Sequence, residues 1–427
     1  MQCRGTCAKL GHTENKAARI SPPPLPAALR AYLAASALAR FANSGLGVLL
    51  GFHLYSLTHD PLTLGWLGLA QAVPAISLVL YGGVIADRHS RRTVALIGRT
   101  TFAGLALLLA LGTLAGPSAM VWIIYAVGFL LGAAAAFTTP AVSGLEAEVI
   151  PAQGALRSVS ILGSASQAAA LAGPVIGSAV FGLFGASPTY AMLAAMFAAS
   201  AAIIRLAVPN RRAPPRSRGD GALTRIAEGI RYVLADQVLI GSMALDLFAV
   251  FFGGATALLP IFATDILHVG PLGFGFLRAA MSVGSLTAML LAVRHPPRAQ
   301  AGLVLHVAIA GFGIAIITFA LSRDFMLSFA ALAVAGACDG VSMVIRQAIL
   351  RLIAPGPMRG RIAAVRSVFI NSSNELGDFE SGMLAGAIGA VPAVWVGGVI
   401  TLVVVGVTAW RAPGLRRLDL GALERAG

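Results

Sequence analysis

The stretch Gly83-Val-Ile-Ala-Asp-Arg-His-Ser-Arg-Arg92 lies between two long apolar runs. A glycine four residues before an acid lets one helix end pack closely against a neighbour. Asp87 can cap and charge-match the N-terminus of the following helix, where an anion is favoured by about 0.3–1 kcal/mol. Arg88, Arg91 and Arg92 form a compact basic cluster, which is typical of the cytoplasmic side of a membrane. The stretch therefore predicts a short cytoplasmic turn between two membrane-spanning helices.

The composition of the whole chain agrees with an integral membrane protein. Of its 427 residues, 57% are hydrophobic and 11% are charged, whereas soluble proteins carry about 25% charged residues. The net charge of +14 is spread over short loops between apolar runs, which argues against nucleic-acid binding. The three cysteines exclude a disulfide framework, and Cys3, Cys7 and His12 do not have the spacing of a zinc site. We therefore expect no metal and no cofactor.

Twelve apolar runs approach the length of about 20 residues that a membrane-spanning helix needs. They predict an all-α polytopic membrane protein with helices over 30–57, 64–86, 93–115, 120–143, 157–184, 188–208, 238–264, 272–293, 300–321, 325–347, 362–388 and 392–411. If the N-terminus is inside, 28 of the 31 Lys and Arg residues fall in inner segments and only Arg323 falls in an outer loop. This asymmetry predicts that both termini are cytoplasmic.

The chain divides into two predicted halves of six helices each, over residues 28–208 and 238–411. Residues 1–27 are expected to be a disordered cytoplasmic tail, and residues 412–427 a second cytoplasmic tail. The linker over 209–237 is basic and contains an amphipathic helix over 222–235 that we expect to lie on the inner membrane face. Weak internal matches at offsets of 204 and 207 residues indicate that the halves are related, as in transporters that bind substrate between two repeats.

Charged residues inside membrane spans are candidate site residues, because each costs roughly 2.5–3.5 kcal/mol at the bilayer centre. Polar and small residues share one face of the first helix and predict a cavity lining: Arg40, Asn43, Ser44, Gly47 and Gly51. The alternative is that Arg40 extends to the inner membrane surface. Gln71 and Gln167 are further cavity candidates in this half.

The second half contains more charged candidates, led by Asp246, Arg278 and Asp339. The eleventh helix adds a polar stripe on one face, which includes Asn371, Asn374, Glu375 and Asp378. Arg278 lies at the depth of the two carboxylates, so we expect Glu375 or Asp378 to pair with it until protonation or substrate breaks the pair. The alternative is a permanent ion pair that fixes the eighth and eleventh helices. Arg346 is interpreted as an anchor at the inner surface.

The opening stretch resembles the loop 2–3 signature of the major facilitator superfamily, Gly-x-x-x-Asp-Arg-x-Gly-Arg-Arg, with Ser90 in place of the second glycine. The resemblance implies a conformational latch in which Gly83 packs, Asp87 faces the start of the eleventh helix, and Arg88, Arg91 and Arg92 hold the loop. A plain positive-inside loop is the alternative. Gly173, Pro174 and Gly177 are similar to the core of the antiporter motif, although the same residues suit any tight helix pair.

Three shorter patterns resemble the enterobactin-exporter or transmembrane secretion effector branch: Ala39-Arg-Phe41, Gly360-Arg-Ile362 and Asn374-Glu-Leu-Gly377. The resemblance implies proton-coupled export of a drug, siderophore or metabolite by alternating access. It also implies a multi-pass protein of the bacterial inner membrane that works as a monomer, with a small-molecule substrate, a coupling ion and the lipid bilayer as partners. Gly128 occupies the place of the arginine that proton-coupled exporters carry in the fourth helix, so coupling would depend on the C-terminal carboxylates.

Two other functions stay open. The first is an importer or facilitator of a solute such as a sugar or an organic acid, of which a facilitator would work unchanged without a proton gradient. The second is a non-transporting membrane sensor. The sequence contains no clustered histidines, acidic metal motif or activated nucleophile that would predict an enzyme.

Overall fold

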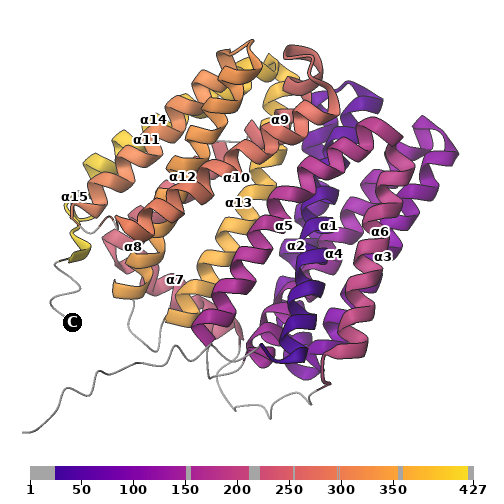
Figure 1. Ribbon diagram of the computed structural model, residues 1–427. Coiled ribbons are helices and arrows are strands. Elements are labelled where there is room, and N and C mark those ends of the chain that lie inside the picture. The colour runs from indigo at the N-terminus through magenta and orange to yellow at the C-terminus, as the bar shows by residue number, and fades with distance from the viewer. Residues whose placement is uncertain are drawn as a thin grey trace, which may run out of the picture.

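The computed structural model describes residues 25–150, 155–210, 222–252, 255–295, 297, 299–353 and 359–421. These residues form helices and no strand (Figure 1). The first group of helices comprises α1 (Ala27–Thr58), α2 (Pro61–Arg88), α3 (Arg91–Gly112), α4 (Pro117–Val149), α5 (Ala155–Phe184) and α6 (Ala186–Ala207). A 3-10 turn, η1 (Thr113–Ala115), follows α3, and α7 (Ala222–Ala235) is the amphipathic helix of the linker.

The second group comprises α8 (Gln237–Phe252), α9 (Ala255–Ile261), the π-helical turn η2 (Phe262–Ile266), α10 (Gly270–Arg294), α11 (Ala301–Leu321), α12 (Phe325–Ile353), α13 (Arg359–Ile388) and α14 (Ala390–Arg411). Within the first group α1 packs on α5 and α6, and α4 packs on α2 and α3. Within the second, α12 packs on α10 and α11. The two groups lie side by side and meet where α2 contacts α13 and α5 contacts α10 (Figure 1).

We call the end of the bundle where α1 ends and α2 begins the distal end, and the opposite end, where α2 ends and α3 begins, the linker end. Tight turns at the distal end use glycine, because Gly116, Gly185 and Gly389 have φ angles of 83–91° that other residues rarely adopt. Asp60 caps α2 by accepting a hydrogen bond of 2.9 Å from the backbone N–H of Leu62, ahead of a proline at the first helical position.

Glycines also permit very close helix contacts in both groups. A methyl group on Gly82 of α2 would lie 2.0 Å from the carbonyl oxygen of Ala136 in α4. In the second group, a methyl group on Gly284 of α10 would lie 1.8 Å from the carbonyl oxygen of Ala333 in α12. These helices therefore pack backbone against backbone, as small residues allow in membrane bundles.

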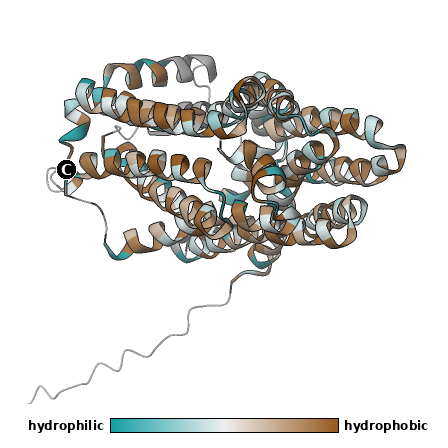
Figure 2. Ribbon diagram, turned by 90° about the horizontal axis from the view of Figure 1, so that it is seen from above, coloured by the Kyte–Doolittle hydropathy of each residue, from teal (hydrophilic) through white to brown (hydrophobic). Residues whose placement is uncertain are grey.

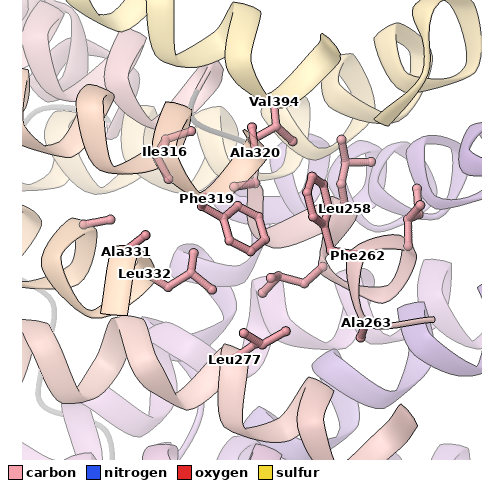
Figure 3. Close-up of a cluster of buried hydrophobic side chains, with 14 of the residues drawn as sticks. Leu258, Phe262, Ala263, Leu277, Ile316, Phe319, Ala320, Ala331, Leu332 and Val394 are labelled. Atoms are coloured by element: carbon pink, nitrogen blue, oxygen red, sulfur yellow. The ribbon is translucent and has the colours of Figure 1, made fainter. Parts of the chain in front are cut away.

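The two groups are joined at the distal end. Tyr55 of α1 donates a hydrogen bond to the Asp265 carboxylate of η2, and the rings of Phe52 and Phe274 stack 4.8 Å apart. A methyl group on Gly65 of α2 would lie 3.2 Å from the Cα of Gly382 in α13. An apolar core in the second group, which includes Phe262 and Phe319, lies beside this junction (Figure 3). Contacts between the groups therefore close the distal end of the bundle.

Among the described residues, ten helices are long and apolar enough to cross a membrane, and Figure 2 shows apolar residues over most of the ribbon. They are α1–α6, α10, α11, α12 and α14. The span predicted over 238–264 is divided into α8, α9 and η2, with residues 253–254 outside the described part. Helix α13 has 30 residues but carries six charged ones, namely Arg359, Arg361, Arg366, Glu375, Asp378 and Glu380. The count of twelve spans stays a prediction.

Helices also occur in the linker and in the C-terminal segment. Helix α7 has the predicted bounds of 222–235 and contacts α8 and α13. Residues 1–24, 211–221 and 422–427 lie outside the described part. The segment from 412 onward, predicted as a tail, folds back through α15 (Pro413–Arg416), which contacts α8 and α11 with Leu415 fully buried.

One prediction about a helix end was wrong. Asp87 does not cap the helix that follows it, because α2 continues to Arg88 and includes Asp87. The cap of α3 is Ser90, whose hydroxyl accepts a hydrogen bond of 3.4 Å from the backbone N–H of Thr93. Ser90 directly precedes the first helical residue, which is the position that lets a short hydroxyl side chain reach the free N–H groups of the first turn.

Candidate functional site

A buried charge cluster connects α8 and α12. The Arg346 guanidinium forms an ion pair with the Asp246 carboxylate, and both side chains are only 7% exposed. Arg346 also lies 3.5 Å from a carboxylate oxygen of Asp339, which precedes it on α12. The interpretation of Arg346 as an anchor at the membrane surface was therefore wrong, because its guanidinium pairs with Asp246 inside the bundle.

This charge cluster borders a cavity of about 180 Å³, which we call the α12 cavity. Its polar lining comes from α8, α12 and α13 and includes Asp246, Asp339, Ser342, Arg346, Asn374 and Asp378. Thr256 of α9 and Phe312 of α11 also line this cavity. Four predicted site residues, Asp246, Asp339, Asn374 and Asp378, are thus brought to one cavity by helices distant in sequence.

A second cavity, of about 100 Å³, lies between the two helix groups, and we call it the central cavity. Gly47, Gly51 and Gln71 line it from the first group. Arg278 and Asp378 line it from the second group, and their opposite charges attract each other. Asp378 and Thr256 line both this cavity and the α12 cavity, so Asp378 stands between the two spaces.

A third cavity, of about 370 Å³, lies within the first group, and we call it the α1–α4 cavity. The predicted residues Arg40 and Asn43 line it from α1. Arg99 of α3 lines it as well, with a side chain only 9% exposed, although the sequence interpretation counted Arg99 among the inner-surface cations. A signal was present, because Arg99 falls inside the span predicted over 93–115.

The basic residues of the opening stretch contact the first group. Arg91 donates a hydrogen bond of 3.1 Å to the carbonyl oxygen of Gly144 and lies 3.2 Å from the Glu148 carboxylate, both on α4. Arg92 donates hydrogen bonds to carbonyl oxygens at the end of α6. Arg88 is exposed, and the Asp87 side chain lies outside the described part. A Cβ added to Gly83 would meet nothing within 4 Å.

The remaining predicted residues fall in three places. Gln167 is exposed on α5 and lines none of the three cavities. The side chains of Asn371 and Glu375 lie outside the described part. Gly173 is where α5 approaches α1, because a methyl group there would lie 2.4 Å from the carbonyl oxygen of Phe41. Its neighbours Pro174 and Gly177 face α10 and Leu49 of α1, respectively.

The described residues contain no group of three or more His, Cys, Asp or Glu that could hold a metal ion. The arrangement offers other chemistry. A carboxylate between two cavities, facing a guanidinium, can exchange its partner for a proton or a charged solute. Buried ion pairs such as that of Arg346 and Asp246 also hold helices in a defined register.

Two helix groups, cavities between and within them, and intramembrane charges define a multi-pass membrane transporter of the major facilitator type. The family model described as transmembrane secretion effector matches residues 28–424, and the chain belongs to this family.

Curated relatives point to the same family. The enterobactin exporter EntS of Shigella boydii serotype 4 is 26% identical over 354 residues, which is 81% of this chain and 81% of the relative. The enterobactin exporter EntS of Escherichia coli O139:H28 is 25% identical over 350 residues, with the same coverage of both chains.

Solved structures share the fold at lower sequence identity. A mutant form of the nucleoside transporter NupG has a TM-score of 0.72 at 14% identity, covering 91% of this chain and 98% of its own. A POT family transporter in complex with 5-aminolevulinic acid has a TM-score of 0.73 at 12% identity, covering 91% and 97%. A bacterial homolog of the human lysosomal transporter Spinster, in an inward-facing and occupied conformation, has a TM-score of 0.69 at 16% identity, covering 92% and 97%.

Proposed function

We propose that this transporter is a proton-coupled exporter of a small organic molecule of the siderophore class. The observation that carries the proposal is the position of Asp378, which lines both the central cavity and the α12 cavity and attracts Arg278. A carboxylate in this position can bind a proton or pair as an anion with its arginine partner. Protonation removes the negative charge on which the ion pair depends. The relatives named as enterobactin exporters support the substrate class and the direction.

The proposed coupling is a competition at one acid. While Asp378 is ionised it neutralises the charge of Arg278, which lowers the free-energy cost of burying both groups in the membrane interior. When Asp378 takes up a proton, it can no longer bind a cationic or hydrogen-bond-donating group of the solute, so proton and solute exclude each other, as movement in opposite directions requires. Each proton that returns down the membrane potential supplies about 2.3 kcal/mol per 100 mV for the opposite movement of solute.

The closed end of the bundle indicates the side from which this state can load solute. The contacts of Tyr55 with Asp265 and of Phe52 with Phe274 close the distal end. The excess of Lys and Arg at the linker end supports its assignment to the cytoplasm. In this state, therefore, solute would load from the cytoplasm, and release would follow when the distal end opens. In this scheme the two helix groups would move relative to each other as units, one over residues 28–208 and the other over residues 238–411.

The test is accumulation of radiolabelled enterobactin by inside-out membrane vesicles that contain this protein, with and without a protonophore. We expect accumulation that the protonophore abolishes, and a loss of at least tenfold in Asp378→Asn. Glu380→Gln is the matched control, because Glu380 lies two residues further along α13 and lines neither cavity. Its carboxylate accepts a hydrogen bond from the Ser381 hydroxyl.

Three outcomes would contradict the proposal. Equal uptake with and without the protonophore would favour a facilitator, and uptake only by right-side-out vesicles would favour an importer. Normal gradient-driven accumulation by Asp378→Asn would exclude Asp378 as the coupling acid.

A further inference from the structure

The α1–α4 cavity contains two arginines that the coupling scheme above does not use. Arg99 reaches it from α3 and Arg40 from α1, and the two side chains are close enough for their positive charges to repel each other. Arg99 is 9% exposed, whereas Arg40 is exposed towards the cavity. Two like charges in one intramembrane space are unfavourable unless something of opposite charge lies between them.

The protein supplies little to balance Arg99. The groups that act on it electrostatically are the Tyr32 phenol and Arg40, and within the described part of the chain no carboxylate is among them. Its Nε–H is buried and has no hydrogen-bond partner there. Glu146 also lines the cavity, but its charge acts on Tyr32. Arg99 is therefore a buried cation with an unused donor that lines a cavity large enough for a solute.

The rest of the lining suits a polar, oxygen-rich group. Asn43 and several hydroxyl residues, namely Tyr32, Ser36, Thr138, Thr139, Ser143 and Ser166, surround the two arginines. Some hydroxyls already donate to backbone carbonyls, as Thr138 does to Ala134 at 2.7 Å, so their O–H groups are not free for a solute. The strong free donors are thus the guanidinium groups.

We propose that Arg99 and Arg40 form a binding site for an oxyanion, a carboxylate or phosphate group, on the organic solute that this protein transports. A planar guanidinium presents paired N–H donors that match the two oxygens of such a group. The assignment of the oxyanion to the solute rests on the proposed transport function. The site lies in the first helix group, whereas Asp378 and Arg278 lie in the second.

The experiment is equilibrium dialysis of the purified full-length protein in nanodiscs with three radiolabelled probes: citrate, benzoate and inorganic phosphate. We expect saturable binding of at least one organic acid, which unlabelled phosphate displaces. The affinity should fall at least tenfold in Arg99→Gln and in Arg40→Gln. Arg323→Gln, which removes an exposed arginine from the turn before α12, should bind like the wild type.

One further variant, Arg99→Lys, and a lipid comparison keep the result decisive. Arg99→Lys keeps the charge but not the paired donors, so we expect intermediate binding. Arg40→Gln changes a cavity-exposed residue and tests the site even if Arg99→Gln does not fold. Nanodiscs of phosphatidylcholine alone are compared with nanodiscs that also contain phosphatidylglycerol, whose headgroup carries the same phosphate chemistry.

Three outcomes would overturn the inference. The first is binding that the arginine variants leave unchanged, and the second is no binding of any of the three probes. The third is loss of citrate and benzoate binding whenever phosphatidylglycerol is present, which would assign the arginines to a lipid headgroup. Because dialysis needs no proton gradient, a failure here leaves the vesicle result intact, and a failure of gradient-driven transport leaves the binding result intact.

Discussion

Arg346 of α12 and Asp246 of α8 form an ion pair whose side chains are each only 7% exposed. The pair borders the α12 cavity, so it joins two helices that form the wall of a candidate solute space. A buried pair of this kind adds little stability over a well-packed apolar pair, but loss of one partner leaves an uncompensated charge.

The first prediction concerns this pair. Asp246→Asn should destabilise the protein by about 3–5 kcal/mol, because it removes the carboxylate that pairs most closely with the buried Arg346 charge. The double variant Asp246→Asn with Arg346→Gln should recover much of that loss. Chemical unfolding in detergent, arranged as a double-mutant cycle, measures both. A double variant as unstable as the sum of the single variants would mean that the two residues do not stabilise each other.

The second prediction concerns the distal end. A Cβ at Gly386 of α13 would lie 3.6 Å from the Cβ of Leu62 of α2, so cysteines at these two positions should form a disulfide in a variant whose native cysteines are replaced by serine. We expect oxidation to stop transport and reduction to restore it, because the distal end must open to release solute. Each single-cysteine variant is the control. Full transport by the oxidised double variant would show that the distal end does not need to open.

The third prediction compares Gly83 of the opening stretch with Gly82, which directly precedes it. Gly82→Ala should destabilise the protein by about 1–3 kcal/mol, because the new methyl group meets the backbone of Ala136 at 2.0 Å. Gly83→Val should leave stability unchanged, because that position is open in this state. If Gly83 packs only when the linker end closes, the same variant should lose transport. Thermal unfolding and vesicle uptake measure the two effects, and normal uptake by Gly83→Val would exclude the latch role of Gly83.

The fourth prediction separates two arginines of the same stretch. Arg91→Gln should lose the contacts with Gly144 and Glu148 and cost about 0.2–1 kcal/mol, the range for partly exposed pairs. Arg88→Gln is the control, since Arg88 is exposed and both changes remove one positive charge. Transport by Arg91→Gln should fall several-fold relative to Arg88→Gln. Equal behaviour of the two variants would support a plain positive-inside loop.

The helices could be predicted from the sequence because membrane spans are local features of composition. Helix α7 has its predicted bounds, since its amphipathic pattern is complete within fourteen residues. The pairing of Arg346 with Asp246 could not be predicted, because the residues are one hundred positions apart and nothing in the sequence states that α8 and α12 are neighbours. Arg99 was counted among the inner-surface cations, because counting Lys and Arg assigns each cation to a side of the membrane and does not indicate how deeply its side chain is buried.

The polar character of α13 has a consequence for how the protein is made. With six charged residues in 30, this helix is a poor candidate for independent insertion by the translocation machinery, since each charge near the centre adds roughly 2.5–3.5 kcal/mol. Its contacts with α2 and α8, and the attraction of Asp378 to Arg278 of α10, come from helices that are synthesised earlier. Entry of α13 into the bilayer should therefore wait for its partners, so that the residues proposed to couple transport also set the order of assembly.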